Sequence, residues 1–123
     1  MEDLLAISRA LSDEHRVRAL LALERGELCV CQLIELLGLA PSSVSRHLRM
    51  LHDAGLLVAR KQGRWLYYRR ITQEEHASRR AALGAIAWVD EALGRSTAIR
   101  SDRQSLRAIR KTELTELCAC YSR

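Results

Sequence analysis

The chain has 123 residues, which is enough for one compact domain with a single core. Hydrophobic residues make up 48% of it, but aromatic residues only 4% with no Phe, so the core must consist of Leu, Ile, Val and Ala, which favours helices over a large sheet. No apolar run approaches the roughly 20 residues that span a bilayer, and the acidic start Met1-Glu2-Asp3 lacks the basic flank of a signal peptide. We therefore expect a cytoplasmic protein with reduced thiols and no membrane partner.

The positive charge is concentrated in one block of the chain. The formal net charge is +5 and the sequence pI is about 9.4. Residues 41–70 contain seven basic side chains and only one acidic side chain, Asp53. A positive field of this kind suits the phosphate backbone of a nucleic acid, because each neutralised phosphate releases condensed counterions.

Two helices are expected at the N-terminus. Apolar residues at helical spacing predict a short first helix that contains Leu4, Leu5, Ile7 and Leu11. A second helix is expected over 13–25, with Ser12 as its N-cap and Gly26 as its end. Acidic residues in its first turn agree with the direction of the helix dipole.

The next segment predicts two short helices joined by a tight turn. The first covers 29–37 and ends at Gly38, and the second covers 42–52 after Pro41. The second helix is apolar on one face and carries Ser, Arg and His on the other, which is typical of a helix-turn-helix whose second helix enters the major groove of operator DNA. The candidate DNA contacts on it are Ser42, Ser43, Ser45, Arg46, His47 and Arg49.

A β-hairpin is expected after this helix. Short strands over 56–59 and 65–68 flank a turn at 61–64. This hairpin would form a wing, in which Lys61 and Arg64 are further candidate DNA contacts. The predicted fold class is mainly α with a small β-hairpin, a winged helix-turn-helix.

The C-terminal part divides into a helix and an extension. An apolar stripe predicts a helix over 73–93, and such a stripe on a terminal helix of a small domain commonly buries against a partner subunit. We therefore expect a homodimer, with residues 1–93 forming the DNA-binding and dimerisation domain. The extension, 94–123, is either a last helix over about 101–115 with a mobile tail or a disordered tail.

All four cysteines lie in two Cys-x-Cys pairs, Cys29 with Cys31 and Cys118 with Cys120. Closely spaced thiolates suit soft, thiophilic ions. Residues two apart on an α-helix point about 200° away from each other, so Cys29 and Cys31 can share an ion only at the frayed start of their helix or by unwinding it. Because this helix directly precedes the predicted DNA-reading helix, such a distortion would lower DNA affinity.

The motifs together resemble the ArsR/SmtB family of metalloregulatory winged-helix repressors, most of all its arsenic-responsive members. The resemblance depends on three segments: Glu27-Leu28-Cys29-Val30-Cys31-Gln32-Leu33, close to the family's metal box; Ser42-Ser43-Val44-Ser45-Arg46-His47-Leu48 as recognition helix; and the Gly63-Arg64 wing that runs into Tyr67-Tyr68. It implies a homodimer paired through the first helix and the 73–93 helix. It also implies a repressor that binds operator DNA without inducer and is released when a metal or metalloid binds.

The resemblance also bears on the inducer. Family members that respond to arsenite or antimonite use three thiolates, and in one arrangement the third cysteine lies a helical turn after the metal box, where this chain has Ile34. The third thiolate must then come from Cys118 or Cys120, and we expect arsenite or antimonite as inducer. Two Cys-x-Cys pairs could equally form a four-thiolate site for cadmium, lead or zinc.

Two other classes of function compete with metal sensing. A thiol-redox-switched repressor would use the same cysteines to form a disulfide and would respond to peroxide. An enzyme is not expected, because the chain lacks a Cys-x-x-Cys motif within a βαβ pattern and a catalytic His partner near its cysteines.

Overall fold

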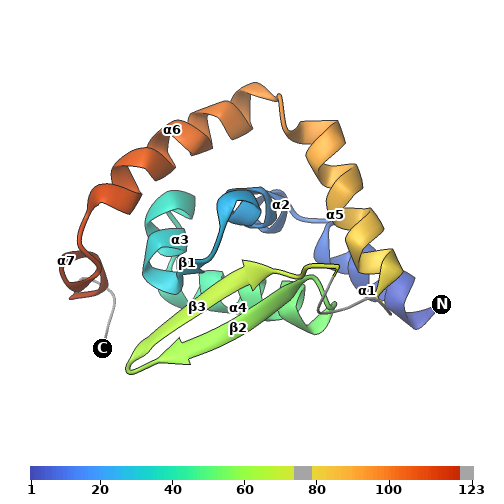
Figure 1. The fold of residues 1–123 in the computed structure, drawn as a ribbon, viewed down its shortest axis with the longest axis horizontal. Helices are drawn as coiled ribbons and strands as arrows, with labels where there is room; N and C mark the ends of the chain where they lie inside the picture. Colours follow the sequence, from blue (N-terminus) through green and yellow to red (C-terminus); the bar gives the residue numbers. More distant parts are fainter. Residues whose placement is uncertain (74–78, 120–123) are drawn as a thin grey trace.

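The computed structural model describes residues 1–73 and 79–119, and Figure 1 shows their arrangement. The helices are α1 (Glu2–Ala10), α2 (Glu14–Ala22), the short 3-10 helix η1 (Leu23–Arg25), α3 (Val30–Leu37), α4 (Pro41–Asp53), α5 (Arg80–Leu93), α6 (Thr97–Lys111) and α7 (Leu114–Ala119). The strands are β1 (Leu28–Cys29), β2 (Leu57–Gln62) and β3 (Trp65–Arg70). The predicted class, mainly α with a small antiparallel sheet, is confirmed.

The start of α2 differs from the prediction by one residue. Asp13, not Ser12, is the N-cap: its Oδ1 accepts hydrogen bonds from the backbone N–H groups of His15 (2.8 Å) and Arg16 (3.2 Å). Ser12 instead donates its hydroxyl to the carbonyl oxygen of Arg9 at 2.7 Å. The prediction for Ser12 is wrong because its hydroxyl closes the turn after α1, which leaves the next carboxylate to cap α2.

The helix-turn-helix is formed by α3 and α4. Gly38 ends α3 with φ 67° and ψ 23°, a left-handed conformation that glycine adopts without a steric penalty. Pro41 opens α4, where its missing N–H leaves no hydrogen bond unmade. Val44, Leu48 and Leu51 are fully buried, so the opposite face of α4 points outward.

The sheet contains one strand more than the sequence predicts. Its order is β1-β3-β2. β2 continues closer to the turn than expected, to Gln62, and β3 begins at Trp65 as predicted but continues to Arg70. The added strand, β1, has two residues, which pair as Leu28 with Tyr68 and Cys29 with Tyr67. The expectation that a helix begins at Cys29 is therefore wrong by one residue, because two residues are too few to show a strand periodicity.

The C-terminal extension is helical and packed as far as residue 119. The helix predicted from residue 73 begins at Arg80, and residues 74–78 lie outside the described part of the chain. From Thr97 onward, α6 and α7 continue as an arc over α2 and α3 (Figure 1). Ile99, Leu106, Ile109 and Leu117 of these two helices join the same hydrophobic core as the rest of the protein. The alternative of a wholly disordered tail is thus wrong for this segment.

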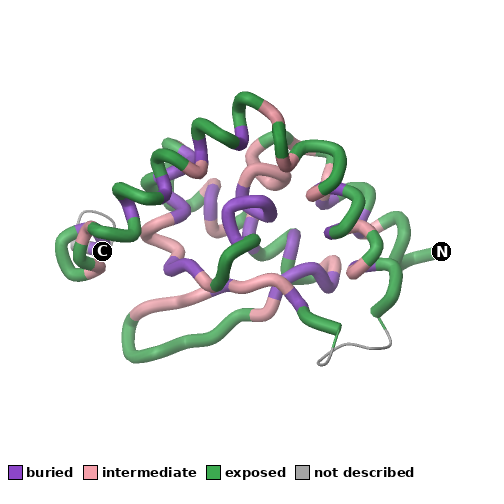
Figure 2. Tube along the Cα trace, turned by 45° about the horizontal axis from the view of Figure 1, so that its top comes forward, coloured by how far each residue is buried: buried purple, intermediate pink, exposed green. Residues whose placement is uncertain are grey.

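The burial pattern places the core between the helices and leaves the hairpin outside. Figure 2 shows buried residues on the inner faces of the helices and an exposed hairpin end. Within residues 1–73 and 79–119, no helix has the length and apolar character that crossing a membrane requires.

Candidate functional site

Three of the four cysteines lie together in the structure. Cys29 ends β1, Cys31 lies in the first turn of α3, and Cys118 comes from α7; their sulfur atoms are all within 4.8 Å of one another. The Sγ atoms of Cys29 and Cys118 are 3.9 Å apart. Cys31 and Cys118 are joined as a disulfide across 87 residues of sequence, with their Cα atoms 5.3 Å apart. Cys120 lies outside the described residues.

The backbone at Cys29 explains how both cysteines of the first pair reach one point. Cys29 is the N-cap of α3 and is extended, with φ −71° and ψ 149°, so only Cys31 belongs to the helix. The Cys29 N–H donates to Oε1 of Gln32 at 2.8 Å, which fixes this entry into the helix. The expected position at the start of the helix is therefore present without any unwinding.

Cys118 reaches the other two thiols because α6 and α7 are held against the domain. Arg18 of α2 donates through Nε and Nη2 to the two carboxylate oxygens of Asp102 in α6, at 2.9 and 3.0 Å. At the far end of the arc, Leu117 and Cys118 are buried where α7 packs on α3. The third thiol is thus supplied by tertiary packing and not by sequence proximity.

Two of the three clustered cysteines, Cys29 and Cys118, are buried, and Cys31 is partly exposed. Cys29 is only 1% exposed, and burial raises the pKa of its thiol although the backbone N–H groups of Cys31 and Val30 at the start of α3 favour the thiolate. The thiol is therefore protonated in the metal-free protein at neutral pH, and an ion that binds its thiolate must release a proton. Once the bond between Cys31 and Cys118 is reduced, the cluster offers three soft sulfur donors. Their sulfur atoms lie within about two metal–sulfur bond lengths of ~2.3 Å of one another, which suits a thiophilic ion.

The structure divides six of the seven basic side chains in residues 41–70 into two groups; the seventh, Arg69, donates to the carbonyl oxygen of Arg70 at 3.3 Å. Arg60 donates to Glu27 (Nε to Oε2, 3.2 Å), and Arg70 donates to Asp90 (Nη1 to Oδ1, 3.1 Å), so both are used inside the molecule. Four other basic side chains are exposed and have no hydrogen-bond or ion-pair partner in the described part of the chain: Arg46, Arg49, Lys61 and Arg64. These four are the basic residues that the sequence analysis selected as DNA contacts.

The remaining candidates on α4 differ in how far they are exposed. Ser42 is exposed, whereas Ser43 and Ser45 are partly buried. His47 is partly buried and faces α2: Arg16 Nη1 donates to its Nδ1 at 3.1 Å, and its ring stacks on that of His15 at 6.0 Å between centroids. This arrangement leaves only part of the His47 ring for contact with DNA.

Asp13, His15 and His47 form a second group of metal-type ligands within 4.8 Å of one another, which the sequence analysis missed. No spacing signal could have revealed it, because α2 and α4 meet only in the folded chain. Each member already has a structural role: Asp13 caps α2, and His47 accepts from Arg16 and stacks on His15. These structural contacts explain why the three side chains lie close together.

An apolar face lies on α1 and α5, which run side by side (Figure 1). Leu4 and Leu5 of α1 and Trp88 of α5 are exposed, with 61%, 46% and 67% of their surfaces accessible. Leu4 and Trp88 line a cavity of about 470 Å³ between the two helices. An open cavity rimmed by exposed large side chains is unusual for an isolated soluble chain and typical of a protein–protein contact.

Comparisons with known proteins find bacterial regulatory proteins. Residues 13–58 match the family described as bacterial regulatory protein, arsR family. The arsenic resistance transcriptional regulator ArsR1 of Pseudomonas putida KT2440 is 45% identical over 64 residues, 51% of this chain and 50% of that protein. A CadC homolog of Staphylococcus aureus, a cadmium resistance transcriptional regulatory protein, is 40% identical over 68 residues, 54% of this chain and 55% of that protein. The chain thus spans about half the length of these curated relatives.

A solved structure extends the match over more of the chain. It is described as an ArsR family transcriptional regulator, is 32% identical, has a TM-score of 0.54, and covers 77% of this chain and 93% of its own. The likeness therefore includes elements beyond the helix-turn-helix.

The environment of His47 predicts a pH dependence of stability. Burial lowers its pKa below the ordinary value of 6.5, and Arg16 adds to this effect while Asp13 opposes it. Below pH 6.5 the unfolded chain binds a proton at residue 47 that the folded protein does not. The free energy of unfolding should therefore decrease as the pH is lowered, by at most about 1.4 kcal/mol per pH unit. Chemical denaturation at several pH values between 7.5 and 5 measures this. His47→Gln should flatten the profile and His52→Gln, an exposed control, should not; an unchanged profile in His47→Gln contradicts the assignment.

Proposed function

Since the chain belongs to the ArsR family of transcriptional regulators, we propose that it is a metalloid-responsive repressor that binds operator DNA as a homodimer. In this proposal, the repressor leaves the DNA when arsenite or antimonite binds the thiolates of Cys29, Cys31 and Cys118. The proposed place of action is the cytoplasm, where operator DNA and reduced thiols occur together. The matched family and the relatives described above are regulators of transcription, not enzymes.

The convergence of three thiols from separate elements carries this proposal. Cys29, Cys31 and Cys118 have sulfur atoms within 4.8 Å of one another, and Cys29 and Cys118 are buried. Trivalent arsenic and antimony form three bonds to sulfur and retain a lone pair, so three thiolates complete their coordination. Cadmium, lead or zinc is the alternative inducer if Cys120 supplies a fourth thiolate, since these ions accept four sulfur ligands.

The position of the thiols supports a coupling to DNA binding. Cys29 pairs with Tyr67 of β3, the second strand of the hairpin, and α3 continues through Gly38 into α4. An ion that draws the three sulfurs together changes both the β1–β3 pairing and the start of α3. Because both DNA-reading elements then move relative to each other, the bound ion favours a conformation with lower operator affinity.

The proposed DNA-binding surface consists of the outward face of α4 and the hairpin. Arg46 and Arg49 would contact bases or phosphates in the major groove, with Ser42, Ser43, Ser45 and His47 beside them. Lys61 and Arg64 at the hairpin end would contact the backbone or the minor groove. The lack of internal partners for these four basic side chains, in the described residues, supports this assignment.

A second copy of the chain is the proposed occupant of the apolar face on α1 and α5. Two copies related by a twofold axis would bury Leu4, Leu5 and Trp88 and would present two recognition helices to one operator.

A thiol-redox-switched repressor is the second candidate function, and the disulfide between Cys31 and Cys118 favours it. Peroxide would oxidise one thiol to a sulfenic acid, with release of one water. The second thiol would then attack the sulfenic sulfur and form the disulfide, with release of a second water. This reaction removes two of the three ligands and needs no ion. The two candidates therefore differ in their response to peroxide and arsenite.

Cys118→Ser should separate induction from DNA binding. We expect the variant to bind operator DNA normally but to need at least about tenfold more arsenite for release, because one of three thiolates is lost. Fluorescence anisotropy of labelled operator DNA, selected from a random duplex library and titrated under reducing conditions, measures this.

Cys120→Ser is the matched control and should respond as the unmodified protein does. Equal loss of response in both variants would indicate a four-thiolate site instead. Release by peroxide without arsenite would support the redox candidate and contradict metalloid induction.

Arg46→Ala and Arg49→Ala should each weaken operator binding. A side chain that reads a base contributes about 1–3 kcal/mol and its loss relaxes preference at one position, whereas a phosphate contact lowers affinity on all sequences and reduces the salt slope by about one. Anisotropy titrations at several salt concentrations measure both effects. Arg107→Ala, on the opposite edge of the molecule, should leave operator affinity unchanged, and an equal loss there would refute the assigned surface.

Trp88→Glu should dissociate the proposed dimer. Placing a charge where a large aromatic side chain is buried should cost about 2 kcal/mol or more, roughly a 30-fold weaker self-association. Sedimentation velocity over a range of protein concentrations measures this. Ala108→Glu adds the same charge to the exposed face of α6 and should remain dimeric; an unmodified protein that sediments only as a monomer would overturn the assignment.

A further inference from the structure

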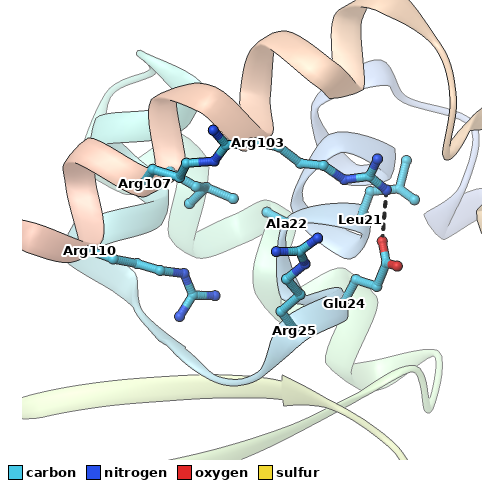
Figure 3. Close-up of a pocket in the computed structure, with 8 residues that line it drawn as sticks. Leu21, Ala22, Glu24, Arg25, Arg103, Arg107 and Arg110 are labelled. Atoms are coloured by element: carbon cyan, nitrogen blue, oxygen red, sulfur yellow. Dashed lines mark hydrogen bonds and ion pairs between the residues drawn. The ribbon is translucent and has the colours of Figure 1, made fainter.

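A second cavity lies between α6 and the end of α2 with η1, on the opposite edge of the molecule from the hairpin (Figures 1 and 3). It has a volume of about 270 Å³. Leu21, Ala22 and Leu106 form its apolar part, and arginines from η1 and α6 surround them. We refer to it as the arginine cavity.

The charges around the arginine cavity are not balanced. Glu24 is the only carboxylate that lines it, and its Oε2 already accepts from Arg103 Nη2 at 2.9 Å. Arg25, Arg107 and Arg110 are exposed and have no hydrogen bond or ion pair to any residue in 1–73 or 79–119. Figure 3 shows Arg25 of η1 and Arg110 of α6 extending toward the same space. Like charges that extend toward the same space repel, and an anion placed between them relieves that repulsion.

The position and size of the arginine cavity separate it from the DNA-binding surface. The hairpin and α6 lie on opposite edges of the molecule (Figure 1), so a duplex on α4 and the hairpin would not lie along α6, which carries Arg107 and Arg110. A concave site of this volume, partly apolar with convergent polar groups, has the form of a small-molecule site.

We propose that the arginine cavity binds a small organic phosphate. Its phosphate group would lie among Arg25, Arg107 and Arg110, and its apolar part would contact Leu21, Ala22 and Leu106. A carboxylate has two oxygens and one charge, and a single guanidinium group can bond both oxygens. A phosphate dianion has three terminal oxygens and two charges, so it can accept hydrogen bonds from three guanidinium groups. The count of free arginines therefore favours phosphate.

An occupied arginine cavity would also tighten the attachment of α6. Arg25 belongs to η1 and the other two arginines to α6, so a bound phosphate bridges the domain and the C-terminal arc. Because the ligand binds only the folded arrangement, it should raise the thermal unfolding temperature, and the rise should grow with the logarithm of ligand concentration above the Kd.

Isothermal titration calorimetry with phenyl phosphate tests the proposal on the full chain, reduced and without arsenite or DNA. We expect saturable binding, weakened at least about tenfold by Arg107→Ala or by Arg110→Ala, because each removes a charge-assisted hydrogen bond. Arg100→Ala is the matched control, an exposed arginine of α6 outside the cavity, and should leave the affinity unchanged. Phenyl phosphate should also raise the unfolding temperature of the unmodified protein but not of Arg107→Ala.

Other ligands in the same titration identify what the cavity recognises. Inorganic phosphate should bind more weakly than phenyl phosphate because it lacks the apolar part, and benzoate should bind more weakly because it lacks the second charge. Absence of saturable binding, an equal loss in Arg100→Ala, benzoate binding as tight as phenyl phosphate, or displacement by duplex DNA would each overturn the proposal. None of these outcomes depends on whether arsenite induces the protein.

Discussion

The ion pair between Arg18 and Asp102 is the contact on which the thiol cluster depends. Asp102 is only 8% exposed, and both of its carboxylate oxygens accept from the Arg18 guanidinium, which fixes the position of α6 on α2. Hydrophobic contacts alone tolerate sliding of a helix along its partner, whereas a buried bidentate pair specifies one register. With α6 fixed, α7 packs against α3 and Cys118 meets Cys29 and Cys31. The pair thus acts at a distance on a site that neither residue touches.

The short strand β1 connects the thiol cluster to α4 and to the hairpin, the two proposed DNA-reading elements. Cys29 belongs to β1, which pairs with β3 of the hairpin, and it also caps α3, which leads into α4. A chain with Cys29 inside a regular helix would point its sulfur away from Cys31 and from the hairpin. The extended backbone at this one residue therefore provides the common site and its mechanical link to the DNA-binding surface.

The arginines of this chain fall into three groups, which only their surroundings distinguish. Arg18, Arg60 and Arg70 pair with carboxylates and hold elements together. Arg46 and Arg49 project from α4 without internal partners in the described residues, as a DNA-binding surface requires. Arg25, Arg107 and Arg110 surround a cavity on the other edge of the molecule. A count of charge along the sequence assigns Arg60 and Arg70 to the same group as Arg46, because it contains no information about which carboxylate lies next to each side chain in the fold.

The sequence by itself determined the local structure and the chemistry of the site. Periodicity and the turn residues Gly38 and Pro41 predicted the helix-turn-helix, and the alternation in 56–68 predicted the hairpin, because these signals depend on neighbours along the chain. The two cysteine pairs likewise predicted a thiol site. Only the tertiary structure decided that Cys118 supplies the third sulfur, that Cys29 lies in a strand paired with Tyr67, and that Arg60 and Arg70 pair with Glu27 and Asp90. Those outcomes depend on contacts between residues up to 89 positions apart, and such contacts are fixed by packing and carry no signal in local spacing.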